Sequence, residues 1–194
     1  MMMINKKIYL LLTDTGTLFT KLIKLFTKKR YNHASIALDA ELLNVYSFGR
    51  KKVHNPVQGG FVKEDVEQRF FQHADCAIYS LPVTESQLEQ MKRFIRNIEE
   101  EEKNYRYHFL GLFGFILNKP ITREKAFFCS QFVATVLMEC DIMEFEKPLS
   151  LVAPFDLLED AAWRLEYEGK LKDYPHQKKS DDFSSPVFLP VENV

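Results

Sequence analysis

Hydrophobic and polar positions divide the first part of the chain into short strands around one helix. The apolar run at residues 8–12 ends in a polar turn and predicts a buried strand over residues 6–13. Residues 17–29 place Leu and Phe on one side and Lys on the other at helical spacing, with Thr17 as the N-cap. Alternation in residues 32–38, a polar turn and a second apolar stretch at 43–48 together predict a β-hairpin.

The later segments add further helices and a final polar stretch. Gly59-Gly60 and the acids Glu64-Asp65 indicate a long connection, and residues 77–81 a further strand that ends at Pro82. Thr84 to Gln87 form a capping-box pattern that opens a helix to about residue 103. The aromatic, glycine-punctuated residues 105–114 indicate a short helix or a pocket wall. Residues 127–140 predict a helix or a short strand-like entry into one, and 155–168 a further helical piece, before a loosely ordered tail.

These elements favour the α+β class, because the strands cluster in hairpins instead of alternating with helices. The 194 residues, 46% apolar and 27% charged, suit one domain over residues 1–175 with a polar C-terminal tail at 176–194. No apolar stretch is long enough to cross a bilayer, and the first strand lacks a signal-peptide cleavage site. We therefore expect a cytoplasmic protein.

Charge is nearly balanced over the whole chain but unevenly distributed. The net charge is −1, whereas residues 1–30 alone carry +6. The basic face of helix 17–29 belongs either to an ordinary surface helix or to a peripheral contact with an anionic lipid surface. No nucleic-acid-binding module, P-loop or zinc-ligand spacing occurs, so neither a nucleic-acid partner nor a metal or other cofactor is expected.

Three cysteines, an odd number, fit a reducing compartment better than a disulfide scaffold. Cys76 and Cys140 lie in apolar segments and are interpreted as core thiols. Cys129 lies in the first turn of the helix over 127–140, where backbone N–H groups and the helix dipole favour the thiolate. Placement alone leaves it either a core thiol or a nucleophile. His33, beside the small residue Ser35 on its strand face, and His108 are candidate bases.

Two segments together resemble a known family. Tyr31-Asn-His33-Ala-Ser-Ile-Ala-Leu38 with Leu43-Asn-Val-Tyr-Ser-Phe48, followed later by Phe127-Phe-Cys129-Ser-Gln-Phe-Val133, resemble the permuted papain-like superfamily. Within it they resemble the YiiX/YebB-like branch of the NlpC-type cysteine peptidases and amidases, akin to lecithin–retinol-acyltransferase-like proteins. The resemblance spans roughly residues 8–160. It implies a circularly permuted papain-like fold, in which an antiparallel sheet or small barrel packs against helices and the cysteine begins a helix.

The resemblance also implies site residues and an activity. Cys129 matches the nucleophile, His33 the general base, and Ser47 the polar residue that orients the imidazole from the return strand. Glu64 is the alternative source of a carboxylate and a candidate substrate-binding residue. Tyr105 and Tyr107 are either substrate-binding residues or core aromatics. The implied protein is a thiol hydrolase that forms an acyl-enzyme with a small amide or peptide. A lipid-directed thiol acyltransferase or hydrolase, and a non-catalytic binding module with the same fold, are the alternatives.

Overall fold

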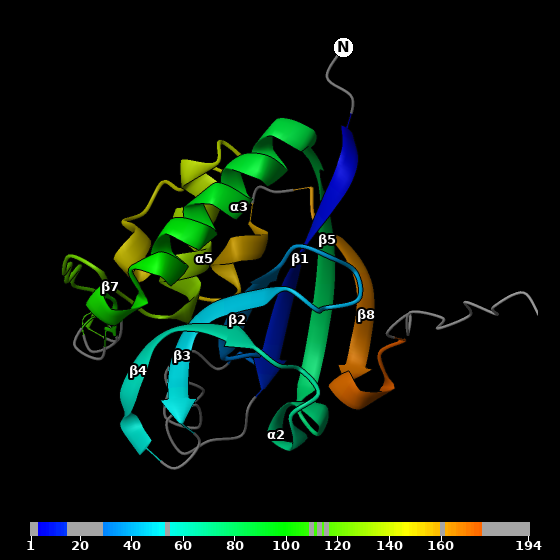
Figure 1. Cartoon of the computed structure of the whole chain (residues 1–194), viewed down its shortest axis with the longest axis horizontal. Helices are drawn as coiled ribbons and strands as arrows, with labels where there is room; N and C mark the ends of the chain where they lie inside the picture. Colours follow the sequence, from blue (N-terminus) through cyan, green and yellow to red (C-terminus); the bar gives the residue numbers. More distant parts are fainter. Residues whose placement is uncertain are drawn as a thin grey trace, which may run out of the picture.

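A six-stranded antiparallel sheet, in the order β4-β3-β2-β1-β5-β8, forms the centre of the computed structural model (Figure 1). The structure describes residues 4–14, 29–52, 55–108, 111, 114, 117–159 and 162–175. The strands are β1 (Ile4–Asp14), β2 (His33–Ala37), β3 (Val45–Lys52), β4 (Asn55–Glu64), β5 (Asp75–Thr84) and β8 (Arg164–Lys170). The predicted α+β class, with antiparallel hairpins, is confirmed.

Two longer helices lie together on one face of this sheet (Figure 1). They are α3 (Glu85–Glu100) and α5 (Cys129–Glu139). Helix α3 begins at the predicted capping box, because the Thr84 hydroxyl accepts from the Gln87 backbone N–H while the Gln87 side chain accepts from the Thr84 N–H. The short β6 (Arg106–Tyr107) and β7 (Ala126–Phe127) pair in parallel just before α5.

Strand alternation divides the buried side chains between the two sheet faces. Ile8, Leu10 and Leu12 of β1 pack under α3 and α5, whereas Leu11 packs on the opposite face. That opposite face is covered by α2 (Arg69–Gln72) and the 3₁₀ turn Leu171–Asp173, through Phe71 and Leu171. The fold is thus a sheet whose larger core holds α5 firmly against β2 and β3.

Two predictions are wrong. Residues 55–64 are not a connection but β4, which pairs with β3 along its length. Gly59 is glycine because a Cβ there would lie 2.6 Å from the Tyr107 Cβ, so close packing and not a loop explains it. Residues 155–168 are not a helix but the 3₁₀ turn Asp156–Leu158 followed by the edge strand β8. Pairing with β5 overrides the helical preference of its Leu and Glu residues.

Two further predictions lie outside the described residues. One is the basic helix at 17–29, most of which is not described, together with the peripheral membrane contact expected for it. The other is the tail at 176–194. Within the described part of the chain, no helix combines the length and apolarity that a membrane crossing requires.

The aromatic centre of the larger core gives a stability prediction. Phe132 on α5 is fully buried and packs against the rings of Phe48 and Phe61. We expect Phe132→Ala to lower the free energy of unfolding by about 3 to 5 kcal/mol, because it removes a ring and leaves a cavity. Urea denaturation measures the loss. Met138→Ala, an exposed position on the same helix, is the matched control, and an equal loss there would contradict this role for Phe132.

Candidate active site

A chain of contacts joins Cys129, His33 and Glu64, which come from three separate elements. Cys129 begins α5, His33 begins β2, and Glu64 ends β4. The Cys129 thiol and the His33 side chain are hydrogen bonded to each other. His33 Nε2 lies 2.7 Å from Glu64 Oε1. The three side chains therefore form a continuous thiol–imidazole–carboxyl arrangement.

The beginning of α5 places the Cys129 sulfur among backbone donors. Its N-cap residue, Phe128, has no polar side-chain atom with which to accept from the first-turn N–H groups. The Ser130 N–H instead hydrogen bonds to the Cys129 sulfur. The Ser130 hydroxyl donates to the Val152 carbonyl at 2.7 Å and so anchors this first turn to the chain that follows α5. The helix start therefore favours negative charge on the sulfur.

A gap in the sheet brings β2 to the same sulfur. In the described strands, β2 pairs with β3 only through Ile36 and Ala37, so the ladder stops before residues 33–35. Ala34 therefore forms no backbone pair with β3. Its N–H donates to the Cys129 sulfur and its carbonyl accepts from the Ser47 hydroxyl at 2.9 Å. One residue of β2 thus helps to hold the thiol in place.

Contacts within the site move two pKa values in opposite directions. Burial alone would raise the pKa of the Cys129 thiol, but its hydrogen bond to His33, the charge of His33 and the two backbone N–H donors lower it below its ordinary value. Burial alone would lower the pKa of His33, but the charge of Glu64 and hydrogen bonds to Cys129 and Glu64 raise it. The thiolate–imidazolium pair is therefore favoured over two neutral groups.

Glu64, and not Ser47, contacts the imidazole. The Ser47 hydroxyl donates to the Ala34 carbonyl, so the expectation that Ser47 orients His33 is corrected. The reason is geometric, because Ser47 lies on β3 beside the gap, where the unpaired carbonyl is its nearest acceptor. Glu64 was expected in a connection, and β4 instead carries it to the ring.

Ser35 is a site residue whose contacts the sequence did not reveal. It is fully buried on β2, two residues after His33 and on the same strand face. Its hydroxyl donates to Glu64 Oε2 at 2.5 Å and lies 3.3 Å from His33 Nε2. The only sequence signal was its small size on the face of His33.

Tyr105 and Tyr107 lie in and beside β6, which pairs with the strand leading into Cys129. The Tyr105 ring packs on Phe48 and stacks on Phe127, and Tyr107 packs against Gly59 of β4. Both are partly buried against the larger core. Their packing is that of core aromatics, and a role in binding substrate stays a prediction.

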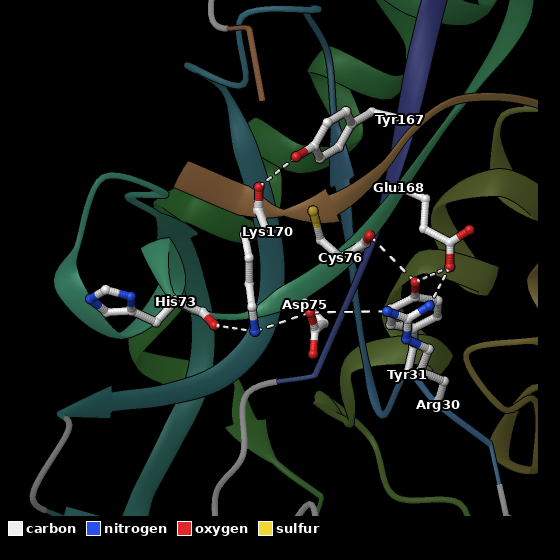
Figure 2. Close-up of polar contacts among 8 residues, drawn as sticks. All are labelled: Arg30, Tyr31, His73, Asp75, Cys76, Tyr167, Glu168 and Lys170. Carbon is white, nitrogen blue, oxygen red and sulfur yellow. Dashed lines mark hydrogen bonds and ion pairs between the residues drawn. The ribbon is translucent and has the colours of Figure 1, made fainter. Parts of the chain in front are cut away.

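A polar network fixes the chain just before His33 (Figure 2). Arg30 Nη1 lies 2.6 Å from Glu168 Oε1 on β8, and the Tyr31 hydroxyl lies 2.7 Å from the same oxygen. Lys170 Nζ, also from β8, lies 3.0 Å from Asp75 Oδ1 and donates to the His73 carbonyl. Figure 2 shows Arg30 and Tyr31 beside Glu168 of β8, with Arg30 also beside Asp75 of β5, and these contacts help to hold residues 30–31 where β2 begins.

No family model, curated protein or solved structure matches this chain.

The three cysteines, none of them in a disulfide, should differ sharply in reactivity. Burial raises the pKa of Cys76 to about 12 and that of Cys140 to about 11, whereas the pKa of Cys129 is lowered. Thiolate persists above the pKa of each group and is lost as the pH falls through it. We expect iodoacetamide to label Cys129 first at neutral pH, with labelling kept to lower pH than at the other two sites. Mass spectrometry of each cysteine measures this.

The His33→Ala variant tests the cause. Without the imidazolium, the midpoint of the Cys129 labelling profile should move to higher pH, toward the ordinary value of about 8.5. Equal labelling rates at all three cysteines in the unmodified protein would contradict the lowered pKa.

Proposed function

We propose that this protein is a cysteine hydrolase that cleaves a small amide or peptide through an acyl-enzyme on Cys129. The observation that carries the proposal is the contact chain from the Cys129 thiol through His33 to Glu64. A nucleophilic thiol needs a base within hydrogen-bond reach and a third group that orients the base. Cys129, His33 and Glu64 provide the thiol, the base and the orienting group that this chemistry needs.

The proposal includes a permuted papain-like fold. In such a fold the histidine strand precedes the cysteine helix along the chain. Here His33 opens β2 and Cys129 opens α5, which packs on the sheet that contains β2. The six-stranded antiparallel sheet under α5 supports this assignment. We also infer a reducing compartment, where a free, thiolate-favouring Cys129 keeps its reactivity.

Acylation begins with attack of the Cys129 thiolate on the substrate carbonyl carbon, which forms a C–S bond and places negative charge on the carbonyl oxygen. Because α5 begins at Cys129, its first-turn N–H groups are the donors that we assign to that oxyanion. The C–N bond then breaks as the His33 imidazolium gives its proton to the departing amine. The products of this step are the free amine and a thioester on Cys129.

Hydrolysis restores the enzyme. Neutral His33 removes a proton from water as its oxygen attacks the thioester carbonyl, and the C–S bond breaks to release the acid and regenerate the thiolate–imidazolium pair. Because Nε2 of the ring faces Glu64, Nδ1 is the nitrogen that carries protons between thiol, water and leaving group. Glu64 acts as a positioning residue that fixes this tautomer and stabilises the imidazolium.

Acylation by p-nitrophenyl acetate tests the proposal without knowledge of the natural substrate. We expect a burst of p-nitrophenolate and a transient mass gain of one acetyl group on Cys129. Cys129→Ala should abolish both, and His33→Ala should slow acylation by about 10² to 10⁴-fold, because the thiol then lacks its base. Intact-protein mass spectrometry and stopped-flow absorbance measure the two signals.

Cys140→Ala is the matched control, since it removes a buried thiol from the other end of α5. It should leave the burst unchanged. A normally folded protein that forms no adduct on Cys129 would instead indicate a non-catalytic binding module.

A further inference from the structure

Glu64 must reach across a strand to contact His33. The sheet order places β3 between β4, which carries Glu64, and β2, which carries His33. Neighbouring strands lie about 4.8 Å apart, so the side chains have to meet over β3. Ser47 and Gly49 lie on β3 beneath this crossing, and the His33 Cε1 atom comes within 3.8 Å of where a Cβ on Gly49 would lie. Small residues on β3 leave room for the two side chains.

A long carboxylate side chain that crosses a strand needs a fixed end. Glu64 has three side-chain torsions, and Oε1 is its atom in contact with His33. Oε2 accepts from the Ser35 hydroxyl at 2.5 Å. Glu64 and Ser35 are both buried, at 8% and 0% exposure, so water does not compete strongly for this contact.

Ser35 also contacts the histidine itself. Since its proton points to Glu64 Oε2, its oxygen presents a lone pair to the Nε2–H group of His33 at 3.3 Å. Ser35, Glu64 and His33 thus form a closed triangle, in which each group contacts the other two. Within this triangle the short bond is the one to Glu64, so the hydroxyl acts on the positively charged ring by fixing the carboxylate against it.

We propose that Ser35 is a positioning residue of the active site, which locks the Glu64 carboxylate against His33. The inference rests on the proposed function and extends it by one residue. The charged groups that act most strongly on this site are His33 from β2, Glu64 from β4 and Cys129 from α5. Ser35 is the neutral member that fixes their mutual geometry.

The thiol pKa of Cys129 is the readout, because it needs no substrate. The pH profile of iodoacetamide labelling at Cys129, followed by mass spectrometry, is measured for Ser35→Ala, Glu64→Gln and the double variant. We expect Ser35→Ala to raise the pH midpoint of Cys129 labelling by about 0.5 pH unit or more, and Glu64→Gln to raise it further. The double variant should match Glu64→Gln alone, because Ser35 acts through the carboxylate and the two effects do not add.

Ser80→Ala is the matched control. Ser80 is also buried, at 1% exposure, and its hydroxyl also donates one hydrogen bond to a glutamate, Glu166 on β8, which is not a site residue. The Ser80→Ala variant should lower the urea midpoint as much as Ser35→Ala does while shifting the Cys129 profile far less. The urea midpoints also establish that every variant is folded.

The outcomes separate this inference from the proposed function. If Glu64→Gln moves the profile while Ser35→Ala behaves like Ser80→Ala, Ser35 has no positioning role and the hydrolase proposal stands. If Ser35→Ala and Glu64→Gln shift the profile additively, Ser35 does not act through Glu64 and the inference is overturned. If neither Glu64→Gln nor His33→Ala moves the profile, the proposed active site itself fails.

Discussion

A buried carboxylate has to be paired, and Glu64 imposes that constraint on the centre of this protein. Its side chain is almost completely excluded from water, where an unpaired charge would be strongly destabilising. The partners come from β2, through one imidazole and one hydroxyl. The end of β4, the start of β2 and the small residues of β3 between them therefore belong to one arrangement. The position of His33, and through it the state of Cys129, follows from this pairing.

The surrounding fold fixes the positions of the elements that carry Cys129, His33 and Glu64. The larger core presses α5 onto the sheet through Phe132 and its aromatic neighbours, and this fixes where the helix begins. The polar network of Arg30 and Tyr31 with β8 fixes where β2 begins (Figure 2). Both element ends are thus held by contacts some distance from the sulfur. The Cys129 thiol and the His33 imidazole meet because two separate parts of the molecule each set one of their positions.

Local patterns in the sequence predicted the ends of elements better than their long-range partners. The capping box at Thr84 and the helix that starts at Cys129 are encoded within a few residues, and both were found. Gly59-Gly60 is a common loop signal and predicts a connection where β4 lies, because the packing of Tyr107 that requires Gly59 is non-local. Strand β8 was missed because only its pairing with β5 makes it a strand. The partners of His33 were uncertain for the same reason, since Glu64 reaches the ring only once β4 has joined the sheet.

The hydrogen-bond ladder between β2 and β3 is interrupted beside the site, so the register of β2 decides which backbone groups contact Cys129. Ala34 gives its amide to the Cys129 sulfur and its carbonyl to Ser47, two groups that an ordinary ladder would use on the neighbouring strand. A slip of β2 by one residue along β1 would exchange the two sheet faces and carry His33 away from Glu64. It would also put a different amide against the sulfur. In this protein the alignment of two adjacent strands is therefore as much a part of the site as any side chain in it.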